Sequence, residues 1–330
     1  MNTIKHFVAT AAMLIVLLGA PARGQVRSSK IPIFIDDPFR RADTLKSAQS
    51  QAGQSQTGTF NSIDFPGSVF TEIFANNAQG QAVGIYVDNT SFNLHGFVLS
   101  AGTFTSIDFP GASITFLTGI NSEGQAVGFY ATPTTPLHHP LSFLMSHGVF
   151  TTIDFPGAAG TEFNGINPAG DIVGVHFDSI SAMHGFVLTR GTFADVDFPG
   201  AVSTFAGDNN PQGDIVGSYV DVSGNGHGFL LHQGGFTSID FPGASENASA
   251  CFGSGGTAAN GINSEGTIVG FYCGADGITN HGFLLSNGNF STIDVPGALV
   301  TFAGDINANG EIVGAYVDAS FNVHGFLLTK

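Results

Sequence analysis

The chain has 330 residues, of which 42% are hydrophobic and 10% charged, and its formal net charge is −16 at pH 7. From Gly58 to the C-terminus, 22 acidic residues stand against two basic ones, Arg190 and Lys330. This imbalance excludes nucleic acid as a partner, because binding it requires Lys and Arg to neutralise phosphates, and it disfavours sites that clamp an anion with arginines.

The first 24 residues predict a secretory signal peptide. Lys5 precedes the apolar segment FVATAAMLIVLLGA at 7–20, and small residues follow at a suitable cleavage position. The apolar segment is short for a membrane span, and nothing later in the chain resembles one. We therefore expect a mature protein without a membrane span, secreted to the extracellular space or the periplasm.

Residues 25–57 are predicted to form a low-complexity tail or linker. The stretch SAQSQAGQSQTG at 47–58 is rich in Ser, Gln and Gly, which is typical of flexible linkers. The segment IPIFIDDPF at 31–39 could add a strand or an arm to the main domain. The remaining residues, 58–330, form the folded domain.

The folded domain is a repeat array built on the motif IDFPG. Successive copies are 44, 46, 43, 43 and 54 residues apart, and periods near 43 match a four-stranded propeller blade. The aspartates that mark the six copies are Asp64, Asp108, Asp154, Asp197, Asp240 and Asp294. The spacing predicts an all-β fold with six blades.

Each repeat predicts four short strands, which in the third unit lie at 161–167, 171–178, 184–189 and 192–198. Val, Ile, Phe and Tyr dominate them, as strands prefer. Asn-x-x-Gly separates the first two strands of every unit and predicts a tight hairpin. Pro-Gly after the fourth strand predicts a type II turn.

The ends of the array predict how the ring closes. The array begins with a lone fourth strand at 59–65 and ends after a third strand at 324–329. The N-terminal strand then completes the last blade, which leaves no exposed sheet edge.

Three sets of polar residues recur and lie toward one face of the predicted ring: the IDFPG aspartates, an Asp ending the second strand, and the His of HGF. Apart from the first set, they are Asp88, Asp178, Asp221, Asp318, His95, His184, His227, His281 and His324. They could bind a metal or a ligand. A structural hydrogen-bond network is favoured, because catalysis needs one constellation whereas every repeat must satisfy the same buried groups.

Calcium is a separate possibility, because most carboxylates lack a basic partner and oxygen-rich loops can bind it. No D-x-D-x-D-G loop or nonapeptide calcium motif is present, and exposed acids also keep exported proteins soluble. No cofactor is otherwise indicated.

The second unit departs from the repeat with the segment ATPTTPLHHPLS at 131–142, where Leu141 replaces the repeat His. His138 and His139 could contact a metal or a ligand. Neighbouring residues of a strand face opposite sides, so a Pro-rich surface loop is the preferred interpretation.

The fifth unit carries the extra residues 244–256. Its Cys251 can reach Cys273, and an even cysteine count in an exported chain predicts one disulfide. In the third unit His176 replaces the repeat Tyr, and we interpret it as a packed variant rather than a catalyst.

The segment GINSEGTIVGFY…HGFLL at 261–285 resembles the HAF family of bacterial extracellular repeats, and the resemblance covers about residues 58–330. That family combines a GIN-x-x-G-x-x-VG core with a His-Ala-Phe triplet; here the triplet is His-Gly-Phe, which suggests a divergent branch. The resemblance implies an exported, propeller-like repeat protein, and it adds no established activity.

These observations favour a monomeric, non-catalytic scaffold that binds an extracellular glycan or surface polymer. The absence of Trp weakens a sugar-stacking site. One alternative is a hydrolase or lyase with Asp or His as acid and base. Another is a structural or adhesive protein that binds other proteins. An enzyme would show one cluster of non-repeat polar residues near the axis, and a scaffold would show variation spread over one face.

Overall fold

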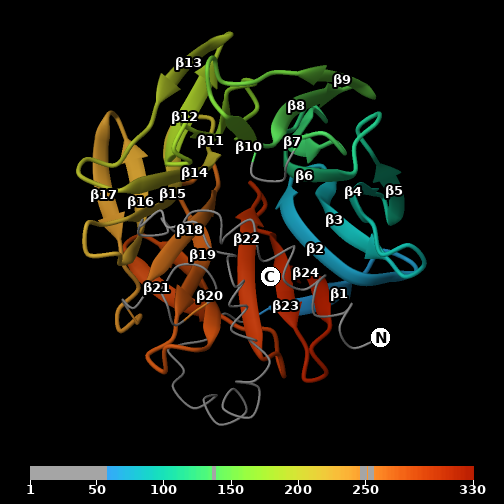
Figure 1. The fold of residues 1–330 in the computed structure, drawn as a ribbon. Coiled ribbons are helices and arrows are strands. Elements are labelled where there is room, and N and C mark those ends of the chain that lie inside the picture. Colours follow the sequence, from blue (N-terminus) through green and yellow to red (C-terminus); the bar gives the residue numbers. More distant parts are fainter. Residues whose placement is uncertain (1–57, 136–138, 246–250, 252–255) are drawn as a thin grey trace, which may run out of the picture.

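The computed structural model describes residues 58–135, 139–245, 251 and 256–330, and every element in them is a β-strand. The strands form antiparallel four-stranded sheets arranged radially around one axis (Figure 1). The fold is a six-bladed β-propeller, as the repeat spacing predicts. None of the described segments forms a helix long and apolar enough to cross a membrane. The predicted signal peptide and tail lie outside the described residues.

The blades follow the sequence repeats, with the first strand of each at the axis and the fourth at the rim. Blades 1 to 3 comprise β2 (Ser68–Asn76), β3 (Ala82–Asp88), β4 (Leu94–Ser100), β5 (Thr103–Ile107); β6 (Ile114–Ile120), β7 (Ala126–Ala131), β8 (Leu141–Ser146), β9 (Val149–Thr152); β10 (Gly160–Ile166), β11 (Ile172–Phe177), β12 (Met183–Thr189), β13 (Thr192–Asp195).

Blades 4 to 6 comprise β14 (Ser203–Asn209), β15 (Ile215–Val220), β16 (Gly226–His232), β17 (Gly235–Ile239); β18 (Thr257–Ile262), β19 (Ile268–Cys273), β20 (Asn280–Ser286), β21 (Asn289–Ile293); β22 (Val300–Ile306), β23 (Ile312–Val317), β24 (Val323–Thr329) and β1 (Thr59–Ile63).

The N-terminal strand closes the ring, as the offset of the repeats predicts. β1 pairs antiparallel with β24, from Thr59 opposite Thr329 to Ile63 opposite Gly325 (Figure 1). A single parallel pair, Phe70 with Val323, also links β2 to β24, so blades 1 and 6 share one hydrogen-bonded sheet. Blade 6 is therefore built from both ends of the array.

The hydrophobic core lies between blades rather than in one central mass. The Phe of each repeat HGF, and its counterpart Phe143 in blade 2, is fully buried. Val173 and Val196 of blade 3, for example, share a cluster with Ala206, Ile215 and Phe229 of blade 4. Each blade is thus apolar on both faces because it is covered by a neighbour on each side.

A closed belt of asparagines ties the six blades together on one face of the ring. The side-chain amide of Asn77 donates to the backbone carbonyl of Asn121 at 2.9 Å, and the same bond is repeated from blade to blade until Asn307 donates to Asn77 at 3.1 Å. The remaining members are Asn167, Asn210 and Asn263. Each asparagine also caps its own hairpin, whose Gly is left-handed, as at Gly80 with φ 78°.

Loss of one belt member should destabilise the whole ring. Asn121→Ala removes a bond to the Asn167 carbonyl at 3.2 Å and the Asn121 Oδ1 contacts with two turn amides. Because the site is buried, we expect the free energy of unfolding to fall by roughly 3 kcal/mol. Denaturant unfolding measures this, with Glu123→Ala, an exposed side chain on the same turn, as the control. Equal losses in the two variants would contradict the role of the belt.

The IDFPG motif builds the rim and the turn into the next blade. In blade 6, Phe65, Pro66, Gly67 and Ser68 form a type II turn, with Gly67 at φ 80° and the Ser68 N–H donating to the Phe65 carbonyl at 3.0 Å. In four repeats the motif Phe stacks on the second-strand Tyr of the adjoining blade, as Phe65 does on Tyr86 with ring centroids 3.6 Å apart. The repeated motif is therefore structural.

Candidate functional site

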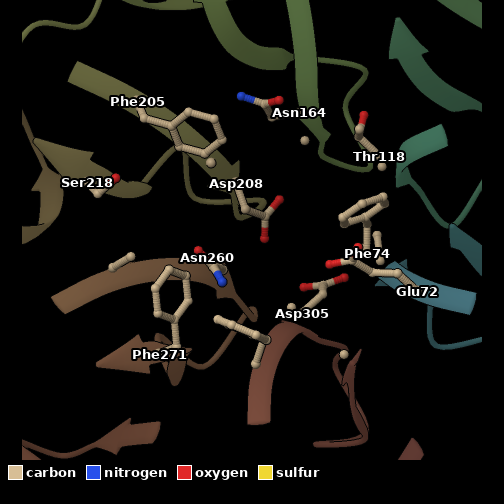
Figure 2. Close-up of a pocket in the computed structure, with 18 of the residues that line it drawn as sticks. Glu72, Phe74, Thr118, Asn164, Phe205, Asp208, Ser218, Asn260, Phe271 and Asp305 are labelled. Carbon is tan, nitrogen blue, oxygen red and sulfur yellow. The ribbon is translucent and has the colours of Figure 1, made fainter. Parts of the chain in front are cut away.

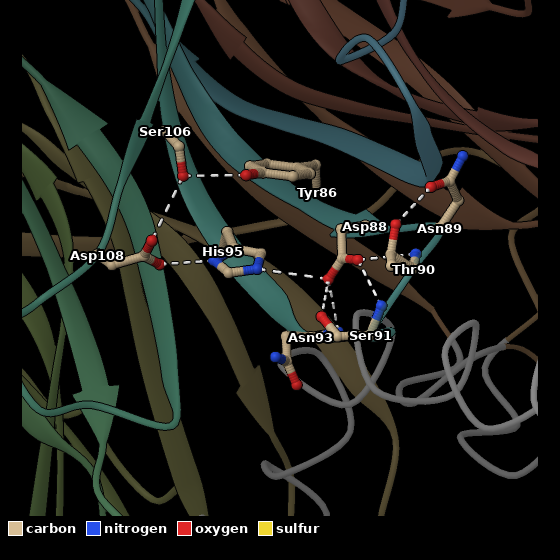
Figure 3. A network of polar contacts seen from close by, with 9 residues as sticks. All are labelled: Tyr86, Asp88, Asn89, Thr90, Ser91, Asn93, His95, Ser106 and Asp108. Atoms are coloured by element: carbon tan, nitrogen blue, oxygen red, sulfur yellow. Dashed lines mark hydrogen bonds and ion pairs between the residues drawn. The ribbon is translucent and has the colours of Figure 1, made fainter.

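The recurring His and Asp residues hydrogen-bond one another at the face opposite the asparagine belt. In blade 1, Nδ1 of His95 donates to the Asp108 carboxylate at 2.8 Å, and Nε2 lies 3.5 Å from Asp88 (Figure 3). The His95 ring also stacks against Tyr86. The His therefore links the third strand to the fourth strand and to the loop between strands two and three.

Four of the other five blades repeat this arrangement. The corresponding Nδ1–carboxylate pairs are His184–Asp197 at 2.8 Å, His227–Asp240 at 2.7 Å, His281–Asp294 at 3.0 Å and His324–Asp64 at 2.9 Å. In blade 2, where Leu141 replaces the His, Asp154 instead accepts the backbone N–H of Ser142 at 2.9 Å. Burial raises the pKa of Asp154.

The aspartates that end the second strand cap the following loops. Asp88 accepts hydrogen bonds from the Ser91 hydroxyl and the backbone N–H groups of Thr90, Ser91 and Asn93 (Figure 3). The Ser91 contacts hold the pKa of Asp88 well below its usual value. Asp178, Asp221 and Asp318 cap their loops in the same way.

Blade 5 also has a loop-capping aspartate, which the sequence pattern missed. Asp276 accepts the N–H groups of Ile278 and Thr279 and the Thr279 hydroxyl. It lies three residues beyond Cys273, whereas the other capping aspartates end or directly follow their strands. A search that allowed the Asp to stand two positions later in its repeat would have found it.

The sequence departures also have structural partners. His176 stacks on Phe155 with ring centroids 3.8 Å apart, and its Nε2 lies 3.3 Å from Asp195. Burial lowers the pKa of His176. The other blades place Tyr and Ser or Thr at these two positions, as with Tyr86 and Ser106 at 2.9 Å. His176 is packed rather than free.

The structure describes one of the two loop histidines and both cysteines. Nδ1 of His139 lies 2.8 Å from the carbonyl of Ala159, whereas His138 lies outside the described residues. Cys251 and Cys273 form the predicted disulfide, with their Cα atoms 5.7 Å apart. Neither His139 nor the disulfide contributes to the cavity described next.

A cavity of about 160 Å³ lies inside the ring, between the innermost strands (Figure 2). Each of these strands carries a β-bulge, and the bulged residue lines the cavity in every blade. The bulged residues are Phe74, Thr118, Asn164, Gly207, Asn260 and Gly304. Bulges re-aim side chains, and here they bring positions that differ from blade to blade to one place.

Polar side chains of the cavity wall bridge neighbouring blades. Asn164 and Asn260 donate to the carbonyls of Ala206 and Ala303, both at 2.9 Å, and Thr118 donates to the Phe163 carbonyl at 2.6 Å. These contacts join blades 2 to 3, 3 to 4 and 5 to 6.

Two aspartates also bridge neighbouring blades, from positions where the other blades have Gly or Ala. Asp208 accepts the Ile262 N–H at 3.0 Å, and Asp305 accepts the Asn76 N–H at 3.0 Å. Burial raises the pKa of Asp208 well above its usual value, and the Asp305 charge adds to the effect. Burial also raises the pKa of Asp305 to about 6.

Glu72 differs from these residues, because its carboxyl has no hydrogen-bond or ion-pair partner among the described residues. It projects from β2 toward the space that Asp208 and Asp305 also face (Figure 2). Burial raises the pKa of Glu72 to about 8. Glu162, at the same strand position in blade 3, does not line the cavity; it is 2% exposed, and its pKa is likewise raised to about 8 by burial.

The cavity residues are those that sequence reasoning missed. Glu72, Asp208 and Asp305 belong to no recurring motif. The recurring motifs instead indicated the His and Asp residues of the repeats, which hydrogen-bond one another. The available signal was a substitution within the repeat, namely Asp where other units have Gly or Ala. Within the described ranges, no group of three or more His, Cys, Asp or Glu residues is arranged to hold a metal ion.

No protein-family model and no curated protein matches the sequence. Among solved structures, a mutant of AofleA from Arthrobotrys oligospora shares 12% identity at a TM-score of 0.48, covering 86% of this chain and 90% of that one. A six-bladed propeller lectin from Aleuria aurantia, described as recognising fucose, shares 12% at 0.47, covering 81% and 93%. TolB from Acinetobacter baumannii shares 11% at 0.48, covering 92% and 72%. At these values the similarity carries no argument about function, and the blade count rests on the strand pairing.

Proposed function

We propose that the protein is an exported binding scaffold that takes part of an extracellular glycan or surface polymer into its axial cavity. The observation that carries this proposal is the unpartnered carboxyl of Glu72 in a cavity where the other two carboxylates, Asp208 and Asp305, bridge blades. The regular His and Asp residues support the frame instead. Export accords with the disulfide, which persists in oxidising compartments. Membership of the HAF family stays a prediction.

The walls suit partial enclosure of a small ligand. Phe205, Phe271 and Phe302 supply apolar surface, and Asn164 and Asn260 supply amide oxygens. Binding sites commonly combine such apolar walls with a few convergent polar groups. The aromatic faces offset the absence of Trp as platforms for a sugar ring.

A hydrolase or lyase is the second candidate, because the non-repeat polar residues cluster at the axis rather than over one face. Acid–base catalysis on a glycan requires two carboxyls that face the substrate. Asp208 and Asp305 are each bound to a backbone N–H of the next blade, which leaves Glu72 as the cavity carboxyl without such a bond. The geometry therefore favours binding over catalysis.

A glycan and cell-wall polymer array, probed with the full exported protein in calcium and in chelator, tests the proposal. We expect a specific signal that Ala258→Phe reduces about tenfold or more, because it fills the cavity wall. Phe already occupies this strand position in blades 2, 4 and 6, at Phe116, Phe205 and Phe302. The new Phe would stand opposite Phe271 on the neighbouring strand. Blade 2 already contains such a pair, Phe116 opposite Phe129.

The matched control is Ile180→Ser, an 83% exposed side chain on an outer loop, which should leave the signal unchanged. An array silent in both conditions would overturn the glycan ligand. A signal that Ala258→Phe leaves intact would place the binding site outside the cavity. Loss of the signal in chelator would add calcium to the requirements.

A further inference from the structure

The cavity has the electrostatic character of a cation site. Glu72, Asp208 and Asp305 face it, whereas neither Arg190 nor Lys330, the basic residues of the chain from Gly58 onward, lines it. A buried carboxylate without a counter-charge is unfavourable, so such a group either holds a proton or pairs with a cation.

Glu72 provides an independent observation beside the acidic character of the wall. Asp208 and Asp305 are occupied by backbone N–H groups. The Glu72 side chain is half-buried, projects into the cavity and has no hydrogen-bond or ion-pair partner in the part of the chain that the structure describes. A carboxyl on a cavity wall that no protein group occupies is available to a ligand.

Aromatic side chains line the same space. Phe74 adjoins Glu72 along β2, and Phe271 lies across the cavity from it (Figure 2). Phe302 also lines the cavity, and its ring centroid is 5.1 Å from that of Phe271. The face of an aromatic ring attracts cations, most strongly where water is excluded. Carboxylates together with aromatic faces match an organic ammonium group, which has apolar substituents around its charge.

We propose that the ligand of the axial cavity carries an organic ammonium group, which binds at the Glu72 carboxylate against the aromatic wall. The inference rests on the proposed function, because it takes the cavity as the ligand site. A metal ion fits less well, since no group of three His, Cys, Asp or Glu ligands is arranged for one within the described ranges.

Binding should then release a proton near neutral pH. The titratable groups that face the site are Glu72, Asp208, Asp305 and Tyr219. With the pKa of Glu72 raised to about 8 by burial, its carboxyl is protonated in the free protein at pH 7. A cation favours the ionised form, so the proton leaves, and the affinity should rise as the pH increases from 6 toward 8.

Titration calorimetry with two matched pairs of probes tests the inference on the full exported protein. Choline is compared with 3,3-dimethylbutan-1-ol, its neutral isostere, and glucosamine with N-acetylglucosamine. We expect each cationic member to bind about tenfold more tightly than its neutral partner. Choline carries a charge that does not titrate, so its pH dependence and the protons released report on the protein alone.

Glu72→Gln should abolish the preference for the cation and the proton release. Glu162→Gln is the matched control, because it removes a buried carboxyl at the same position of blade 3 that does not line the cavity. It should retain both. Thermal unfolding of each variant verifies that it is folded.

The outcomes separate this inference from the proposed function. Equal binding of the charged and neutral probes, or equal effects of the two variants, would overturn the ammonium ligand. An array signal that Ala258→Phe abolishes, without binding of either cationic probe, would leave the scaffold standing and refute the ammonium group. Choline binding unaffected by Ala258→Phe would refute the cavity as the site, and both proposals with it.

Discussion

Deletion of residues 58–65 is expected to abolish cooperative folding of the propeller. These residues contain β1, which pairs with β24 over five residue positions, and Asp64, which bonds His324 at 2.9 Å. Without them, β24 presents an open edge, and Phe326 and Leu328 lose part of their cover. The loss is comparable with the whole stability of a domain, about 5–15 kcal/mol, because β1 is the rim strand of blade 6 and covers part of its core.

Circular dichroism during heating and gel filtration measure the effect of this deletion. The intact protein should unfold in one cooperative transition, and the deletion variant should aggregate or show no transition. The matched control places residues 58–65 after Lys330, at the other end of the chain, where β1 can still pair with β24. This permutation should restore the transition. A deletion variant that melts within a few degrees of the intact protein would refute closure by β1.

Glu162→Gln is expected to stabilise the protein strongly in alkali. Glu162 is 2% exposed and its Oε1 atom has no partner among the described residues. Burial raises its pKa from 4.5 to about 8. The folded state therefore holds this proton more tightly than the unfolded state, so the contribution to stability is full below pH 4.5 and is lost as the pH rises to about 8.

The predicted loss is about 1.4 kcal/mol per pH unit, or roughly 5 kcal/mol in total between pH 4.5 and 8. Gln does not ionise, so the variant should match the wild type near pH 4, gain on it steadily, and keep a constant lead above pH 8. Urea unfolding at half-unit pH steps measures this difference. The other buried carboxyls act alike in both proteins and cancel in the difference.

Glu265→Gln, which removes an exposed carboxyl, is the control for this prediction and should produce no growing difference. If Glu162→Gln is equally less stable at every pH, the carboxyl of Glu162 does not hold a proton in the folded state.

The architecture of this protein could be read from its sequence. The IDFPG and HGF motifs recur because each blade needs the same rim strand and turn, and five of the six use the same His–Asp bond, so their period predicts the blade and their number predicts the ring. The offset at 59–65 predicts closure by β1, and Cys251 with Cys273 predicts the disulfide. These features depend on contacts within one repeat or between its neighbours, and local patterns encode such contacts directly.

The cavity was decided only by the tertiary structure. Glu72, Asp208 and Asp305 come from blades 1, 4 and 6, up to 233 positions apart in the chain, and each stands at an unremarked place on an inner strand. Likewise, six hairpin asparagines signal six turns in the sequence, whereas only ring closure shows that Asn307 bonds to Asn77. A repeat pattern displays what the units share. Only the fold shows that positions at which the units differ come together at the axis, where the six bulges lie.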